Sequence, residues 1–200
     1  MLLLGMSSSA IAVTRYYAGN AQFGGYGVKA DIAWYVSDPA NDHAAWVGND
    51  LSTSGGKWIQ AGLARGNYSA PTSYEEYFAT ANATYRTQYF FDGSGPQPWL
   101  YYRSYDVHRV GTNLWQAWIQ GAARFQGYLG NDNAQICCAL AELLYNGVSS
   151  GVYTMHRSCQ YKATKLSGWS AFNQNHQKAD PPFWSLDPPK GIANYDELAQ

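Results

Sequence analysis

The sequence predicts an all-β fold, an antiparallel double-sheet sandwich formed by a single domain, and three observations support this class. Aromatic residues reach 16% while charged residues make up only 14%. This composition suits half-buried sheet faces, because Tyr and Trp have an apolar body and a polar tip. Apolar and polar residues alternate along short runs that turn residues separate. A chain of 200 residues fits one such domain, since sandwiches of this size commonly remain undivided.

The expected strands follow one another along most of the chain. From Val28 to Trp34 every second residue is apolar, while Lys29 and Asp31 lie between them. This is the period of a half-buried strand. Similar runs follow at 44–47, 57–63, 74–79, 84–91, 99–107, 114–120, 136–144 and 151–156. Clusters of Gly, Asn, Asp and Pro between the runs predict turns. Residues 133–144 are the one stretch whose Ala and Leu content is also compatible with a helix.

The two ends of the chain predict its organisation and location. Residues 2–6 form a short apolar run with no Lys or Arg before it, and the small-x-small sequence of residues 10–12 follows. This pattern favours a secretory signal peptide. We therefore expect a secreted, extracellular protein with a signal-peptide remnant at 1–15, a sandwich domain at 16–178 and a Pro-rich C-terminal arm at 179–200. The sequence has no apolar stretch of 18 residues, so no membrane span is expected.

Charge, histidine and cysteine content restrict the partners. The net charge is −1 and no block of five like charges occurs, which argues against nucleic-acid binding. The four histidines are scattered without metal-ligand spacing, so we expect no metal and no cofactor, and we expect a monomer. The odd cysteine count leaves one thiol unpaired if a disulfide forms. Either Cys137 or Cys138 pairs with Cys159, or all three are buried thiols.

Two runs place polar side chains where they can line a cleft. In the run 57–63, alternation directs Ile59 to the core and Gln60 to the opposite face, together with Trp58. In the run 74–79, alternation places Tyr74, Glu76 and Phe78 on one face. A third run holds the lone carboxylate of Glu142 among Ala and Leu residues. A glutamate is almost never fully buried without a partner, so Glu142 should be paired or line a cleft.

These residues resemble the motifs of the glutamic peptidases (eqolisins), a family of concanavalin-like sandwiches that cleave proteins at acid pH with a Gln–Glu pair. The resemblance covers about residues 28–144. It rests on Ala45-Trp46-Val47-Gly48-Asn49-Asp50, then Trp58-Ile59-Gln60-Ala61-Gly62, then the aromatic–acid stretch 74–78, then Ala141-Glu142-Leu143. It implies that Gln60 and Glu142 are the catalytic pair. The implied substrate-binding residues around the pair, to which alternation adds Trp58, are Trp46, Asp50, Trp58, Tyr74 and Glu76.

The function implied by the resemblance is that of a secreted acid endopeptidase, a hydrolase whose substrate is a polypeptide. A carboxylate such as Glu142 can take a proton from water and return it to the leaving amine, while an amide N–H such as that of Gln60 can bind the oxyanion. Two alternatives involve glycans. Glu76 and Glu142 could form the carboxylate pair of a glycan-hydrolysing sandwich, in which retaining enzymes hold the carboxyl groups ~5 Å apart. An aromatic sheet face could also bind carbohydrate without chemistry.

Overall fold

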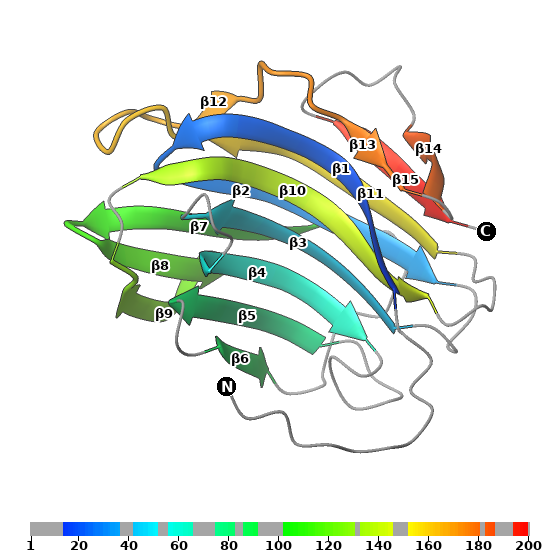
Figure 1. The fold of residues 1–200 in the computed structure, drawn as a ribbon, viewed down its shortest axis with the longest axis horizontal. Coiled ribbons are helices and arrows are strands. Elements are labelled where there is room, and N and C mark those ends of the chain that lie inside the picture. The colour runs from blue at the N-terminus through cyan, green and yellow to red at the C-terminus, as the bar shows by residue number, and fades with distance from the viewer. Residues whose placement is uncertain are drawn as a thin grey trace.

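A computed structural model describes residues 14–36, 42–51, 56–65, 75–82, 86–91, 102–130, 133–145, 152–180, 183–186 and 194–199. Every element of secondary structure assigned in these ranges is a β-strand, and the strands pair antiparallel in two stacked sheets (Figure 1). The predicted fold class, an all-β double-sheet sandwich, is confirmed. Within the described ranges no helix is long and apolar enough to cross a membrane.

Sheet A carries the residues of the candidate site and has seven strands in the order β13-β1-β10-β3-β4-β5-β6. Their bounds are β13 Lys178–Ala179, β1 Thr14–Gly25, β10 Ala134–Tyr145, β3 Asp42–Asp50, β4 Lys57–Arg65, β5 Glu75–Asn82 and β6 Arg86–Phe91. The long strands β1, β10, β3 and β4 curve as they cross the molecule (Figure 1). Strands distant in sequence thereby become neighbours, because β10 lies between β1 and β3.

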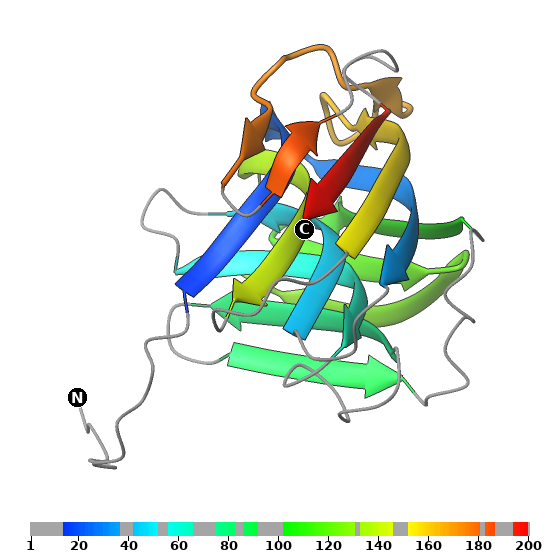
Figure 2. The same ribbon diagram turned by 90° about the vertical axis from the view of Figure 1, so that its right-hand side faces the viewer.

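Sheet B covers the other side of sheet A. Its main path runs in the order β14-β15-β11-β2-β7-β8-β9, and β12 pairs with β11 beside it. The bounds are β14 Phe183–Leu186, β15 Tyr195–Ala199, β11 Val152–Tyr161, β2 Gly27–Val36, β7 Arg103–Gly111, β8 Leu114–Ile119, β9 Ala122–Tyr128 and β12 Ser170–Ala171. Figure 2 shows β1 and β10 on one side of the sandwich and β11 and β2 on the other.

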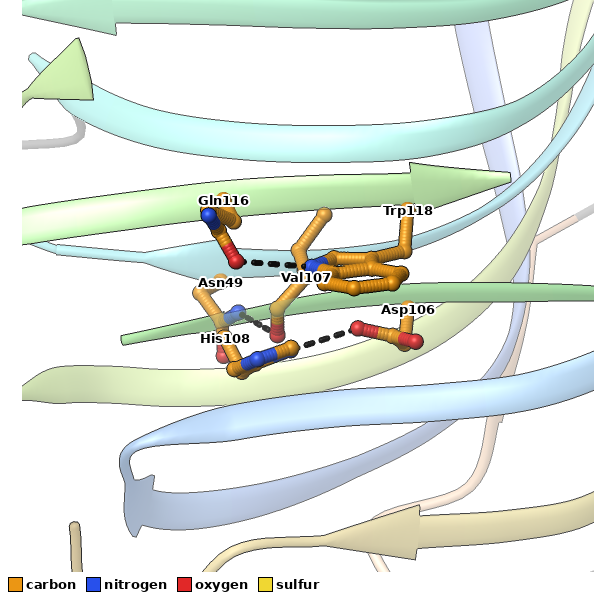
Figure 3. Close-up of polar contacts among 6 residues, drawn as sticks. All are labelled: Asn49, Asp106, Val107, His108, Gln116 and Trp118. Atoms are coloured by element: carbon orange, nitrogen blue, oxygen red, sulfur yellow. Dashed lines mark hydrogen bonds and ion pairs between the residues drawn. The ribbon is translucent and has the colours of Figure 1, made fainter. Parts of the chain in front are cut away.

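The core lies between the sheets and follows the predicted alternation. Ile59 on β4 is fully buried with Ala61 and Leu63, and it packs in one cluster with the inward residues of β2, β7 and β8. The two sheets are also linked by a polar contact, because the Asn49 side-chain amide on β3 donates to the Val107 carbonyl on β7 at 3.0 Å (Figure 3). One face of β4 is thus committed to packing, and the residues between Ile59, Ala61 and Leu63 are directed to the outer face of sheet A.

Two features of the structure differ from expectation, and two questions that the sequence left open are decided. Strand β1 was not predicted, and neither was β9. The expected C-terminal arm contributes β14 and β15, and β15 pairs with β11 over Val152–His156, so this segment belongs to the sandwich. The stretch that could be read as a helix forms β10. The three cysteines are buried free thiols without a disulfide. The expected signal peptide lies almost entirely outside the described residues.

Candidate active site

The candidate site is a cavity of about 490 Å³ on the outer face of sheet A, which we call the cleft face. Strands β1, β10, β3 and β4 supply its floor, and His176 joins it from the segment after β12. The lining is mostly apolar, with Trp46, Ile136 and Leu140 among its large side chains. A few polar groups in an apolar concave surface are typical of small-molecule and substrate sites.

The predicted pair Gln60 and Glu142 lines this one cavity, from strands that β3 separates. Gln60 is level with Gly48 on β3 and Cys138 on β10, whereas Glu142 lies four residues farther along β10. The two are therefore not cross-strand neighbours. At ~3.3 Å per residue and ~4.8 Å between strands, their backbones would be roughly 16 Å apart in a flat sheet. One peptide group can contact both side chains only if the two extend toward each other along the cavity.

Glu142 is held by an indole. Its side chain is buried, at 3% exposure, and the Trp46 Nε1–H donates to its Oε2 at 3.2 Å. The Trp46 ring extends over Gly48, because a Cβ at Gly48 would lie 2.8 Å from Cζ3 and 3.0 Å from Cε3 of that ring. Because Gly48 has no side chain, the Trp46 indole can occupy the space above it. The indole N–H then holds the Glu142 carboxylate at the cavity.

The Gln60 side chain is held by a tyrosine that was not among the predicted site residues. The Gln60 Nε2 donates to the Tyr77 hydroxyl at 3.0 Å. Tyr77 is on β5, opposite Gly62 of β4, and it packs in a cleft-face cluster with Trp46 and Cys138. The alternation of run 74–79 could have indicated this position of Tyr77. Phe78 is in the core, so its neighbour Tyr77 must point to the opposite, outer face of sheet A.

The expected substrate-binding residues separate into two groups. Trp46, Asp50 and Trp58 line the cavity with the pair. Glu76 does not, and its assignment to the cleft is wrong. It lies opposite the core residue Leu63, on the inner face of sheet A. There its carboxylate accepts hydrogen bonds from Arg103 Nη1 and from the Tyr105 hydroxyl, each at 3.0 Å.

The position of Glu76 also removes the carboxylate pair on which the glycan-hydrolysing alternative rests. Glu76 faces sheet B, while Glu142 faces the cavity on the opposite side of sheet A. Alternation had correctly grouped Glu76 with Phe78, but the face that they share is the core face. The remaining expected cleft residue, Tyr74, lies outside the described residues.

The far wall of the cavity was missed because it comes from β1 and from the segment that follows β12. Tyr17 and Ala21 line the cavity from β1. The buried Asn20 side chain joins β1 to that segment, since its Nδ2 donates to the Gln174 carbonyl at 3.2 Å and its Oδ1 accepts from the His176 backbone N–H at 2.9 Å. These bonds place His176 at the cavity, and no local pattern in the sequence indicates a partner more than 150 residues away.

Two other chemistries find little support at the site. Cys138 lines the cavity, but burial raises the pKa of its thiol well above the ordinary value, and the nearby Cys137 and Asp50 raise it further. A thiolate nucleophile is therefore disfavoured there at neutral or acid pH. Among the described residues, no group of three or more His, Cys, Asp or Glu side chains could hold a metal ion.

Comparison with known proteins finds similarity in structure only. No family model and no curated protein matches the chain. Two crystal structures of scytalidoglutamic peptidase with transition-state analogs are similar, with TM-scores of 0.58 and 0.60, identities of 11% and 12%, and coverage of 94% of this chain and 100% of that chain. The structure of a native glycosidic hydrolase is similar with a TM-score of 0.50 and 9% identity, covering 79% of this chain and 82% of that one. At these identities the likeness concerns the fold.

Proposed function

We propose that the protein is a hydrolase that cleaves polypeptides at acid pH, with Glu142 as general acid and base and Gln60 as the oxyanion donor. The observation that carries the proposal is the shared cavity, because a buried carboxylate and a side-chain amide from separate strands face the same apolar surface. The likeness to scytalidoglutamic peptidase over 94% of this chain supports the same reading at the level of the fold.

The reaction follows from these two groups. The Glu142 carboxylate accepts a proton from a water molecule as the water oxygen attacks the peptide carbonyl carbon. An N–H of Gln60 stabilises the negative charge that develops on the carbonyl oxygen. Glu142 then transfers the proton to the leaving nitrogen as the C–N bond breaks, which yields a carboxylic acid and an amine. Because the reference pKa of glutamate is about 4.3, the two roles interchange most easily below neutral pH.

Trp46 has a specific part in this scheme. Its N–H donates to Oε2 of Glu142 at 3.2 Å, which restrains the orientation of the carboxylate. A fixed carboxylate needs no reorientation between accepting and returning the proton, and such preorganisation is a large part of catalytic rate enhancement. Trp58 and Asp50, which also line the cavity, are proposed to contact the substrate chain on either side of the scissile bond.

The test is an assay of purified protein against an unfolded protein substrate from pH 3 to 8, with Glu142→Gln as the comparison variant. We expect cleavage with an optimum below about pH 5 and complete loss in Glu142→Gln, since an amide cannot cycle a proton. Pepstatin should have no effect, because it requires a pair of aspartates. Circular dichroism should show that the variant is folded, since its side chain can still accept the Trp46 bond.

Two results would overturn the proposal. Turnover of xylan or glucan without turnover of protein would assign the cavity to glycan hydrolysis. Binding of glycan with turnover of neither polymer would make the protein a carbohydrate-binding sandwich.

A further inference from the structure

The Gln60 side chain can serve as an oxyanion donor only if an N–H of its amide is held toward the cavity. Glutamine has three side-chain torsions, and ordering them costs conformational entropy. In this structure the order comes from one contact, in which Nε2 donates to the Tyr77 hydroxyl at 3.0 Å. That contact uses one N–H of the amide, and the amide has two. The second N–H is available to a substrate oxygen.

Tyr77 is a rigid partner for this bond. Its side chain is 1% exposed, and it packs with Ala44, Trp46, Ala64, Ala79 and Cys138 on the cleft face of sheet A. A buried tyrosine ring packed on several sides has little rotamer freedom. Strand β5, which carries Tyr77, pairs with β4, which carries Gln60, over eight consecutive residues from Lys57–Asn82 to Ala64–Glu75. The hydroxyl therefore has a fixed position relative to the Gln60 backbone.

Tyr77 does not line the cavity, whereas Gln60 does. The tyrosine thus lies beside the amide, on the neighbouring strand β5 and outside the cavity. We propose that Tyr77 is a positioning residue, whose hydroxyl fixes the Gln60 amide so that one N–H points into the cavity at the position of the developing oxyanion. This inference rests on the proposed hydrolase function for its catalytic consequence, but the hydrogen bond itself can be tested without it.

The catalytic experiment uses Tyr77→Phe, which removes the hydroxyl and keeps the ring that fills the cluster. Because the bond orients a donor that acts in the transition state, we expect kcat to fall roughly tenfold while KM stays within about twofold. In a Gln60→Ala background, Tyr77→Phe should cause no further loss, because the amide that it orients is gone.

A purely structural role for Tyr77 would lower activity by the same factor in both backgrounds, and that result would overturn the proposal. The matched control is Tyr161→Phe, which removes a hydroxyl that accepts a bond from Asn173 at 3.3 Å outside the cavity. It should leave kcat and KM unchanged in both backgrounds.

The second experiment needs no activity. The Gln60 side-chain amide is assigned in a ¹H–¹⁵N spectrum as the pair of signals missing in Gln60→Ala. In the unmodified protein the two protons should have well-separated shifts, as expected for an amide with one bonded N–H, and in Tyr77→Phe the pair should move toward the shifts of a free glutamine. Unchanged shifts in Tyr77→Phe would overturn the positioning role. If the protein cleaves no polypeptide, the proposed function fails, and these spectra still decide the Tyr77–Gln60 contact.

Discussion

On the outer face of sheet B, polar side chains bond to one another, whereas on the cleft face Gln60 and Glu142 are held by their neighbours against a cavity. On sheet B, His108 Nδ1 and Asp106 Oδ1 are 2.5 Å apart, and Trp118 Nε1 donates to Gln116 at 2.9 Å. Each of these bonds joins two residues of one strand, His108 and Asp106 on β7 and Trp118 and Gln116 on β8 (Figure 3). On the cleft face, the corresponding bonds run from Trp46 to Glu142 and from Gln60 to Tyr77.

The outer face of sheet B and the cleft face of sheet A thus carry similar hydrogen-bonded side chains in different surroundings. Each has an indole N–H and a glutamine amide in a side-chain hydrogen bond. On sheet B the Gln116 amide also donates to Gln126 at 2.6 Å, and this bond links β8 to β9. On sheet A both Gln60 and Glu142 lie at the surface of a cavity of about 490 Å³. The comparison indicates that residue type alone does not define a site, and that the space in front of the polar group does.

The largest expected effect distinguishes the two glutamines. Gln60→Ala should lower kcat by roughly 10²–10³, because the oxyanion donor is lost while the base remains. The matched substitution on sheet B, Gln116→Ala, should leave kcat within about twofold, since Gln116 bonds to Gln126 and Trp118 and does not line the cavity. Initial rates at saturating substrate measure both. Equal losses in the two variants would mean that the cleft face has no special role.

A second prediction concerns the support of Glu142. In Gly48→Ala the new methyl group would meet the Trp46 ring at 2.8 Å, so the indole must shift and its bond to Glu142 should weaken. We expect kcat/KM to fall roughly tenfold, which corresponds to ~1.4 kcal/mol of transition-state stabilisation. Gly168→Ala is the control beside the sheet B face, because a Cβ there meets nothing within 4 Å. Unchanged activity in Gly48→Ala would show that Trp46 does not position the carboxylate.

The Glu→Gln substitution, made at Glu142 on the cleft face and at Glu76 on the inner face of sheet A, distinguishes an effect on catalysis from an effect on stability. Glu76→Gln should leave the rate of cleavage unchanged, because Glu76 faces Arg103 and Tyr105 between the sheets. It should lower the free energy of unfolding by about 1–2 kcal/mol, since a charge-assisted bond to a partly exposed Arg is lost. Urea unfolding and the cleavage assay test this. Loss of activity in Glu76→Gln with the fold intact would restore Glu76 as a catalytic carboxylate.

The sequence was informative where one face of a strand is clearly apolar. In β4 the buried Ile59 and its neighbours at 61 and 63 determined the outward direction of Gln60, which the structure bears out. In β5 alternation grouped Glu76 with Phe78 correctly, but the period of two does not say which group is inside. Tyr77 can serve either face, because its ring is apolar and its hydroxyl is polar. Only the pairing of β5 with β4 determines that Glu76 faces the core and Tyr77 faces the outer side of sheet A.

Strand β1 could not be predicted because two of its inward residues are polar. Asn20 and Gln22 are buried, which breaks the apolar alternation that marks a strand. Their partners are backbone groups after β12, where the N–H groups of Asn173 and Gln174 donate to Gln22 Oε1 at 3.1 Å. Such long-range satisfaction of buried polar groups leaves no local signal. The apolar periodicity of the sequence therefore could not predict the cavity wall that β1 supplies.

The smallest expected effect compares adjacent residues on the two faces of β10. Cys137 belongs to the inter-sheet core and Cys138 lines the cavity. Burial raises the pKa of the Cys137 thiol from 9.0 to about 12, and burial also raises the pKa of Cys138. A pKa that is higher in the folded state contributes stability that is complete below the unfolded value of about 9 and is lost as pH rises toward the folded value.

Each thiol should therefore make the protein less stable in mild alkali. For Cys137 the loss between pH 7.5 and 9.5 should be about 1 kcal/mol, measured by urea unfolding in the presence of a reductant. Cys137→Ala and Cys138→Ala should each flatten this pH dependence, whatever their effect at pH 7.5. Val107→Ala, a core truncation without a titrating group, should lower stability equally at both pH values. A flatter profile in Cys137→Ala but not in Cys138→Ala would mean that the cavity around Cys138 is wetter than the core around Cys137, so that the apolar lining does not exclude water from β10.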